Sequence, residues 1–339
     1  MTIFRLAIRQ CGWVLLFLVG GCFGRQQSEI VVYTALDQEF SEPILRQFEQ
    51  ESGIRVRAVY DIESTKTVGL YQRILLERSQ PRCDVFWNNE ILHTLRLERQ
   101  GLLAEYRSPM AAVFPTQYVS SQGRWTGFAG RARVLLVNRN RIAPERAPRS
   151  VLDLADSRRR GEGGMARPLF GTTATHAAVL FSKWGEQQAL DFFEKVRQNA
   201  AIFSGNKQVA EAVSAGRIAF GLTDTDDALI ELQRGQPVTI VWPDQDEGQM
   251  GTLLIPNTVA ILRGAPHPQE AQKLVDYLLS ERIESRLAKS GSGQIPLRRD
   301  AAVQPPLPGI ADVRWMDVDF EAAAEMWQNV ATRLEKLFP

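Results

Sequence analysis

The sequence has few cysteines, few histidines and no excess of charge of either sign. Its 339 residues include three cysteines and three histidines, with 40 basic side chains against 39 acidic ones. This balance leaves no broad basic field, so we expect no nucleic-acid partner. A His-rich metal motif and a nucleophile elbow are both missing, which argues against an enzyme. The remaining composition is typical of a soluble globular protein with two domains.

The N-terminus has the pattern of an export signal. Arg5 and Arg9 precede an apolar run that is too short to span a bilayer comfortably and that ends in two glycines and Cys22. This ending is similar to that of bacterial lipoprotein signals, in which the cysteine is lipidated; an ordinary signal peptide is the alternative. We predict removal of residues 1–21, a lipid on Cys22 and a tether over 22–28. The chain would then be anchored to a membrane on the periplasmic side of a bacterial cell envelope.

Removal of the signal would leave one free cysteine and an almost neutral chain. Without Arg5 and Arg9, 38 basic residues stand against 39 acidic ones. Cys11 would depart with the signal and Cys22 would carry the lipid, which leaves Cys83. We therefore expect no intramolecular disulfide, even in an exported protein.

Strand and helix patterns alternate through the first part of the mature chain. Short β-rich runs are separated by segments with apolar residues at helical spacing, in the order 30–34, 40–53, 54–60, 66–78, 84–87 and a helix that ends at 101. The order β-α-β-α-β-α predicts a doubly wound, mostly parallel sheet flanked by helices.

A second α/β set follows a looser stretch. Strands are predicted at 132–137, 165–170, 218–222 and 238–242, helices at 175–184, 187–197, 208–215 and 226–234, and a long apolar run at 251–262. We expect two α/β lobes joined by hinge strands near 131–137 and 251–262, with a ligand between them. Lobe I would span 29–130, completed by about 256–300, and lobe II 131–255; residues 301–339 would form a Pro-rich segment and an amphipathic helix at 320–337.

Five oxygen-bearing residues, Thr223-Asp224-Thr225-Asp226-Asp227, follow one predicted strand and precede a helical pattern. Open α/β sheets place their ligand sites at such strand ends. Three carboxylates there could bind a metal or a cationic group. The alternative is a capped helix start, where Asp and Thr bind free N–H groups and complement the helix dipole.

Two further turns combine hydroxyl groups with predicted helix starts. They are Ser64-Thr65-Lys66-Thr67 and Gly171-Thr172-Thr173-Ala174-Thr175-His176. Free N–H groups at helix starts, together with hydroxyls and a lysine, can form an anion site. These turns could therefore hold a phosphate or carboxylate, and ordinary capping by Ser and Thr is the alternative.

Several segments, in their order along the chain, resemble the periplasmic ferric-iron-type substrate-binding proteins of ABC importers. The first are Val32-Tyr33-Thr34-Ala35, 48–56 and Cys83-Asp84-Val85-Phe86-Trp87, and the likeness continues through Gly101-Leu102-Leu103, 168–173, 216–219 and 256–260. The resemblance spans nearly the whole mature chain. It implies a two-lobed, hinged receptor, expected to be a monomer, that closes on its ligand and delivers it to an inner-membrane permease. It implies no catalysis.

The resemblance also implies a ligand set. Iron-binding members carry a pair of tyrosines where this chain has Thr225-Asp226-Asp227, a histidine where it has Asp37, and an acidic ligand that falls at Asn89 or Glu90. The acids would still form a set of oxygens that suits a hard cation. We therefore expect ferric iron, with or without an accompanying anion, held by metal ligands among Asp37, Glu90, Asp226 and Asp227.

Two alternatives stay open. The same receptor could take a phosphonate, a sugar phosphate or another organic anion, or the chain could be an exported metal-dependent phosphatase or hydrolase with its metal at the acidic turn. The predicted ligand-binding residues are Asp37, Ser64, Thr65, Asn89, Glu90, Thr172, Thr173, Thr175, Asp224, Thr225, Asp226 and Asp227.

Overall fold

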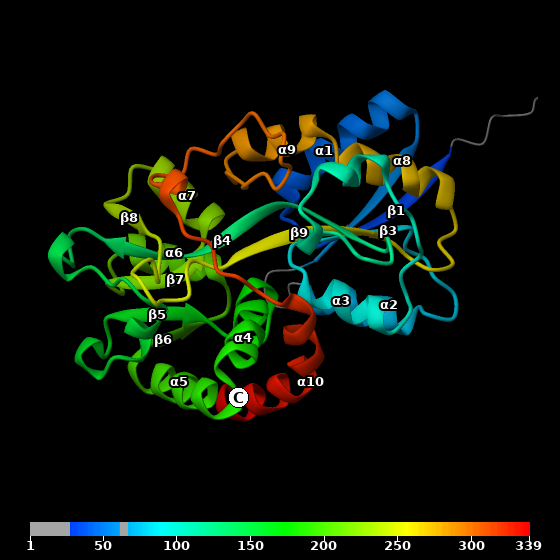
Figure 1. Ribbon diagram of the computed structural model, residues 1–339. Coiled ribbons are helices and arrows are strands. Elements are labelled where there is room, and N and C mark those ends of the chain that lie inside the picture. The colour runs from blue at the N-terminus through cyan, green and yellow to red at the C-terminus, as the bar shows by residue number, and fades with distance from the viewer. Residues whose placement is uncertain (1–27, 62–66) are drawn as a thin grey trace, which may run out of the picture.

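The computed structural model describes residues 28–61 and 67–339, and the fold is drawn in Figure 1. The predicted signal peptide, the lipid on Cys22 and the contacts of Ser64 and Thr65 lie outside the described residues. Within those residues, no helix combines the length and apolar character that crossing a membrane requires.

The first half of the sheet is built from β-α units, as predicted. Strands β1, β2 and β3 run parallel in the order β2-β1-β3, and β9 pairs antiparallel with β3. The elements are β1 (Glu29–Thr34), α1 (Gln38–Ser52), β2 (Arg55–Tyr60), α2 (Val68–Leu76), β3 (Val85–Asn88), α3 (Leu92–Arg99) and β9 (Leu254–Ile261). The helices α8 (Pro268–Leu278) and α9 (Glu281–Lys289) follow β9.

The second half of the sheet is also built from parallel strands and helices. Strand β5 lies parallel between β6 and β7, and β7 pairs antiparallel with β4, which also pairs with β8. Its elements are β5 (Gly163–Ala166), α4 (Gly171–Trp184), α5 (Glu186–Asn199), β6 (Ala201–Phe203), α6 (Asn206–Ser214), β7 (Phe220–Asp224), α7 (Thr225–Gln233) and β8 (Val238–Val241). Short 3-10 helices lie at Pro109–Val113, Thr116–Tyr118, Pro144–Arg146, Val151–Ala155, Ser157–Arg159 and Ile310–Asp312.

Strand β4 (Thr126–Asn138) belongs to both halves. Its first residues pair with β9 as far as Ala132, and from Arg133 onward it pairs with β7, so the path of the sheet reads β2-β1-β3-β9-β4-β7-β5-β6. Figure 1 shows β4 and β9 running side by side between the two groups of helices. The predicted fold class, two α/β lobes with mostly parallel sheets, is confirmed.

The pairing of β4 with β9 is interrupted where β9 carries a proline. Pro256 has no N–H to donate, and the register shifts between Phe128 and Arg131 on the facing strand. Ala129, inside this bulge, has φ +43° and donates its N–H to the buried carboxylate of Glu284 at 2.6 Å. The strand that joins the lobes is therefore held in a bent, strained conformation at this point.

Alternate residues of the central strands pack into two apolar cores. Leu135 of β4 belongs to the core that includes residues of α4, and Leu136 belongs to the core that includes residues of α8 and α9. Helices therefore cover both faces of the sheet, as the continuous apolar strands predict.

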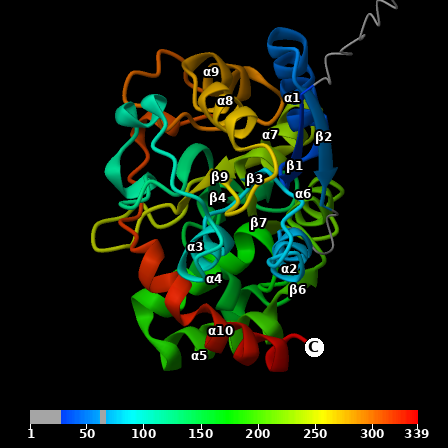
Figure 2. The same ribbon diagram turned by 90° about the vertical axis from the view of Figure 1, so that its right-hand side faces the viewer.

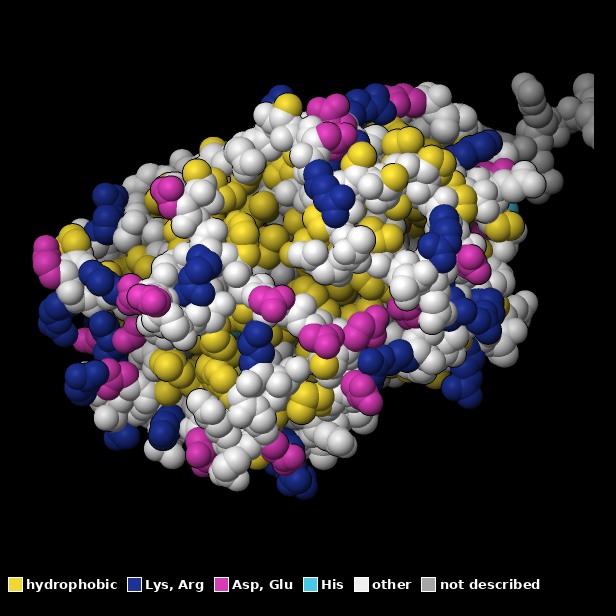
Figure 3. All heavy atoms as spheres, viewed as in Figure 1, with side chains coloured by type: hydrophobic (Ala, Val, Ile, Leu, Met, Phe, Trp, Pro, Cys, Tyr) yellow, Lys and Arg dark blue, Asp and Glu magenta, His cyan; other side chains and the backbone are white. Residues whose placement is uncertain are grey.

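The C-terminal helix α10 (Phe320–Leu337) is found over the predicted residues and touches both lobes. It packs against α4 and α5 and also against α3, where the ring of Trp327 lies 6.4 Å from the ring of His93. Figure 2 shows α10 passing across these helices, with the end of the chain beyond it. On the face drawn in Figure 3, basic and acidic side chains are interspersed, which agrees with the near-zero net charge.

Candidate functional site

A polar cavity lies where strand ends and helix starts of both halves meet. It has a volume of about 30 Å³. Asp37 and Asn89 come from the β1–α1 and β3–α3 turns, and Arg131 comes from β4. The remaining residues belong to the second half of the sheet and to the helices and turns around it. The lining residues are Asp37, Asn89, Arg131, Ala166, Arg167, Phe170, Gly171, Thr172, Thr173, Ser204, Gly205, Asn206, Asp224, Asp226 and Asp227.

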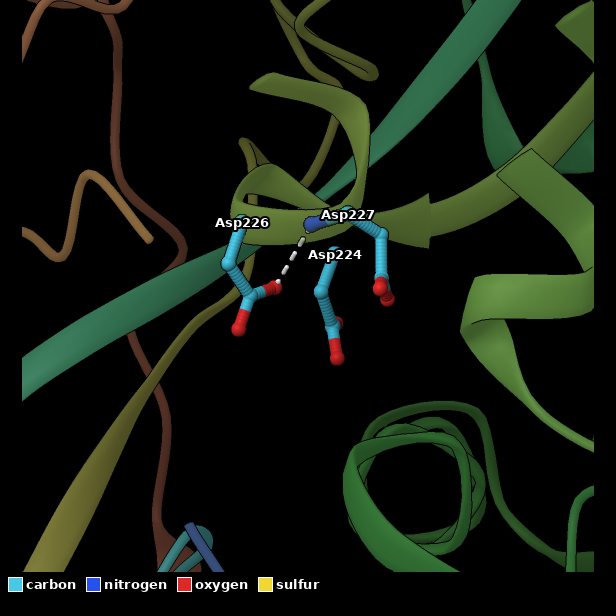
Figure 4. A group of neighbouring side chains, drawn as sticks. All are labelled: Asp224, Asp226 and Asp227. Carbon is cyan, nitrogen blue, oxygen red and sulfur yellow. Dashed lines mark hydrogen bonds between the residues drawn. The ribbon is translucent and has the colours of Figure 1, made fainter. Parts of the chain in front are cut away.

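The predicted acidic turn lies in this cavity. Figure 4 shows the carboxylates of Asp224, Asp226 and Asp227 converging from the end of β7 and the start of α7, and their ligand atoms lie within 4.8 Å of one another. Asp226 accepts the N–H of Asp227 at 3.1 Å. Asp224 stands at the N-cap position of α7, yet its side chain makes no cap hydrogen bond. The capping interpretation therefore does not hold for Asp224.

Asp224 instead is the centre of a buried polar network. Its Oδ1 accepts from Arg133 Nη1 at 2.5 Å, and its Oδ2 accepts from Thr172 Oγ1 at 2.5 Å and from Asn206 Nδ2 at 3.0 Å. Arg133 also donates to the hydroxyls of Thr172 and Thr173, at 3.2 and 3.3 Å. The carboxylate thus has three donors around it, so most of its lone pairs are used.

A second buried arginine stands beside Asp226. The Nε of Arg131 lies 3.4 Å from Asp226 Oδ2, and its Nη2 donates to Asn257 of β9 at 3.0 Å. Burial alone would lower the pKa of Arg131, but the carboxylates of Asp226, Asp224, Asp37 and Asp227 outweigh it and raise the pKa. The guanidinium is therefore a fixed positive charge in the cavity wall.

The sequence analysis did not identify Arg131, Arg133 or Asn206 as site residues. A signal for the arginines was present, because they occupy alternate positions of an otherwise apolar strand and therefore share one of its faces. Charged side chains are almost never fully buried unless they are paired. Two buried arginines therefore require acidic partners, and the acidic turn supplies them.

Two helices begin at the cavity without a side-chain cap. The N-cap residues of α4 and α6 are Phe170 and Gly205, neither of which has an oxygen to accept from the first-turn N–H groups. Thr172 and Thr173 lie in the first turn of α4, as predicted, and Thr173 donates to Asn206 at the start of α6. The uncapped N–H groups and the positive ends of both helix dipoles favour an anion here.

Glu90 lies behind the cavity rather than in its wall. It is fully buried and accepts the N–H groups of Leu92 and His93, at 2.5 and 3.0 Å, so it caps the start of α3. Its Oε2 also accepts from Thr175 of α4 at 2.7 Å. Burial by itself would raise its pKa, but His93 together with the hydrogen bonds from Thr175 and Asn88 lowers the pKa instead. Its oxygens are occupied, and it does not join the three aspartates of the turn.

The other predicted residues divide between the cavity and its supports. Asp37 and Asn89 line the cavity, and Asn89 accepts from Thr67 at 2.6 Å. Thr225 is buried outside the lining and accepts the N–H of Ala132, so it ties α7 to β4. His176 is buried in α4 with Nε2 unpartnered; its pKa lies well below the ordinary value because of burial and the charge of Arg133.

Two α/β lobes with a polar cavity between them define a solute-binding protein. Residues 93–323 match the family model of bacterial extracellular solute-binding proteins, and the chain belongs to that family. This agrees with the resemblance seen in the sequence.

The relatives differ in their ligands. A Fe(3+)-binding periplasmic protein of Serratia marcescens is 24% identical over 306 residues, 88% of each chain. A putative 2-aminoethylphosphonate-binding periplasmic protein of Salmonella typhimurium is 26% identical over 261 residues, 75% of this chain and 72% of that one. The periplasmic binding protein AfuA of Actinobacillus pleuropneumoniae, solved with fructose-6-phosphate, has a TM-score of 0.79 at 24% identity, covering 90% of this chain and 97% of its own. The structural likeness concerns the fold alone.

Proposed function

We propose that this solute-binding protein captures a small organic anion, a phosphonate or phosphate ester, and passes it to the permease of an ABC importer. The observation that carries the proposal is the state of Asp224. Arg133, Thr172 and Asn206 already bind its carboxylate, so the acidic turn is not an open set of oxygens for a cation. Beside it, two uncapped helix starts face the same cavity.

The anionic group of the solute would bind at the starts of α4 and α6. Backbone N–H groups at a helix start attract phosphate and carboxylate oxygens, and the helix dipole adds to the attraction. Arg167 lines the same side of the cavity and can add a charge-assisted hydrogen bond, the stronger kind. Thr172 and Thr173 would position these first-turn groups through their bonds to Arg133.

Asp37, Asp226 and Asp227 would bind the other end of the solute. Carboxylates in a cavity wall accept hydrogen bonds from hydroxyl groups and attract an ammonium group. A phosphonate with an amino group, or a phosphate ester with hydroxyl groups, has both kinds of end. Relatives named for 2-aminoethylphosphonate and solved with fructose-6-phosphate support this class of ligand.

Ferric iron is the second candidate, and the convergence of Asp224, Asp226 and Asp227 within 4.8 Å favours it. Carboxylate oxygens suit a hard cation, and a relative is named for Fe(3+). Two guanidinium groups nevertheless stand beside this cluster, those of Arg131 and Arg133, and they repel a cation. We therefore place iron, with or without an anion, second to the organic anion.

A receptor rather than an exported phosphatase or hydrolase is supported by relatives named as binding proteins. We also propose that the chain works as a monomer, with the lipid on Cys22 holding it near its permease. Incubation with phosphate esters should then give binding without release of inorganic phosphate. Turnover of these esters would favour the enzyme.

Isothermal titration of metal-free protein separates the candidates. We expect saturable heat from 2-aminoethylphosphonate or fructose 6-phosphate and none from ferric citrate. Arg167→Gln should weaken binding of the anion by about tenfold or more, because a hydrogen bond to a charged group contributes about 1.5–3 kcal/mol. Arg217→Gln, at an exposed arginine outside the cavity lining, is the matched control. Heat from ferric citrate alone, weakened by Asp226→Asn with Asp227→Asn, would instead establish iron.

A further inference from the structure

A second cavity adjoins the ligand cavity and shares Arg167, Phe170 and Ser204 with it. We call it the vestibule. It measures about 620 Å³, against about 30 Å³ for the ligand cavity. Its other lining residues are Arg197, Ile202, Phe203, Leu337, Phe338 and Pro339. Figures 1 and 2 both place the end of the chain close to β6 and α5, and this end forms one wall.

The two cavities differ in chemistry. Carboxylates, amides and hydroxyls line the ligand cavity, whereas three phenylalanines, Ile202 and Leu337 line the vestibule. Phe170 stands between them at the N-cap of α4 and is only half-buried. Ligand pockets are lined mainly by apolar and aromatic side chains, with a few polar groups that fix orientation. The vestibule supplies the apolar part that the ligand cavity lacks.

The ligand cavity is small, and the larger vestibule lies directly beside it. A volume of about 30 Å³ suits the anionic group and the small polar groups that reach the carboxylates, but not a bulky substituent as well. The bulkier part of a larger solute would extend out of the ligand cavity, beside the residues that the two cavities share. Arg167 and Arg197, at the vestibule, form no ion pair with any of the described carboxylates.

We propose that the vestibule binds an apolar group of the solute while the anionic group of the same solute is held at the starts of α4 and α6. This inference rests on the proposed function. The solute class becomes narrower: a phosphate ester or phosphonate whose substituent includes an apolar, ring-sized portion besides the amino or hydroxyl group that reaches the carboxylates. Phe170 contacts that portion and separates it from the polar head.

The test compares three probes on the wild-type protein: inorganic phosphate, methyl phosphate and phenyl phosphate. All three present the same anionic group, and only phenyl phosphate reaches into the vestibule. We expect phenyl phosphate to bind about tenfold more tightly than methyl phosphate, because a buried ring removes more apolar area from water. Equal affinity of the two esters would overturn the vestibule and leave the proposed function standing. Failure of all three probes, while 2-aminoethylphosphonate or fructose 6-phosphate binds, would overturn the vestibule alone; failure of every one of these anions would overturn both.

Variants locate the gain in affinity. Leu337→Ala, or Ile202→Ala if the first variant folds poorly, should remove most of the preference for phenyl over methyl phosphate and leave methyl phosphate binding unchanged, because both residues line the vestibule and not the ligand cavity. Leu75→Ala is the matched control, because Leu75 is half-buried like Leu337 and lines neither cavity. If both vestibule variants still prefer phenyl phosphate to methyl phosphate, the ring binds elsewhere and the proposal is wrong.

Discussion

Arg133 and Asp224 lie 91 residues apart and form an ion pair of 2.5 Å with side chains that are 0% and 5% exposed. They are direct cross-strand neighbours in the pairing of β4 with β7. Since β4 is also the strand that joins the two halves of the sheet, the ion pair fixes the acidic turn to the centre of the molecule. The turn therefore has a structural anchor as well as residues that face the cavity.

The first prediction concerns this anchor. Arg133→Met should lower the free energy of unfolding by about 3–5 kcal/mol, because it leaves the carboxylate of Asp224 buried without a compensating charge. Urea denaturation followed by circular dichroism measures the change. Arg158→Met, which breaks an exposed ion pair with Asp156, should leave the midpoint nearly unchanged. Similar midpoints for both variants would show that Arg133 does not stabilise the fold.

Much of the fold could be predicted because local patterns determine it. The helix at Phe320–Leu337 repeats apolar residues at helical spacing, and β1 is a continuous apolar run between turn residues. The predicted boundaries of two elements at the site were less accurate. The strand predicted at 165–170 ends at Ala166, two residues before Pro168. Helix α4 begins at Gly171 instead of Thr175. Residues at strand–helix junctions satisfy both patterns, so spacing alone does not fix the boundary.

The candidate site was partly predictable for a similar reason. Asp37, Thr172 and Asp226 lie at strand or helix ends, where the topology brings them to one cavity. Arg133 could not be assigned to Asp224, because that pairing depends on the register of strands distant in sequence. Glu90 follows a strand end too, but it also precedes α3, and the first N–H groups of that helix bind its carboxylate.

The second prediction concerns pH. Because the pKa of His176 is lowered in the folded state, the unfolded chain binds a proton below pH 6.5 that the folded chain does not. Stability should therefore fall as the pH falls below 6.5, by up to about 1.4 kcal/mol per pH unit from this residue. His176→Leu should remove that component, so the wild-type and variant stabilities, compared by urea denaturation from pH 7 to 5, should diverge. Parallel curves would contradict the assignment.

The third prediction concerns anchoring. Cys22→Ser should release the protein from the membrane fraction or leave the precursor uncleaved, because the thiol that accepts the lipid is missing. Cys11→Ser changes a cysteine inside the predicted signal and should leave anchoring intact, which makes it the matched control. Fractionation and intact-mass measurement read out both variants. A lipid-free wild type in the soluble fraction would contradict the lipoprotein interpretation.

The fourth prediction concerns closure between the lobes that we place at 29–130 and 131–255. The cavity has walls from both, such as Asn89 and Thr173, so a solute favours the closed state only through contacts to both. Small-angle scattering should show a smaller radius of gyration with saturating 2-aminoethylphosphonate or fructose 6-phosphate, whichever binds. An unchanged radius at saturation would indicate a rigid protein or a site elsewhere.

One hydrogen bond across the lobes allows a sharper test of closure. Thr175 Oγ1 donates to Glu90 Oε2 at 2.7 Å, and opening would expose both groups to water. Thr175→Val should therefore cost the closed state about 0.5–1.5 kcal/mol and weaken solute binding by about two- to twelvefold, without changing a residue of the cavity wall. Thr332→Val removes an exposed hydroxyl bonded within α10 and serves as the control. Unaltered affinity in Thr175→Val would mean that this hydrogen bond persists in the open state, so that the lobes move about an axis beyond it.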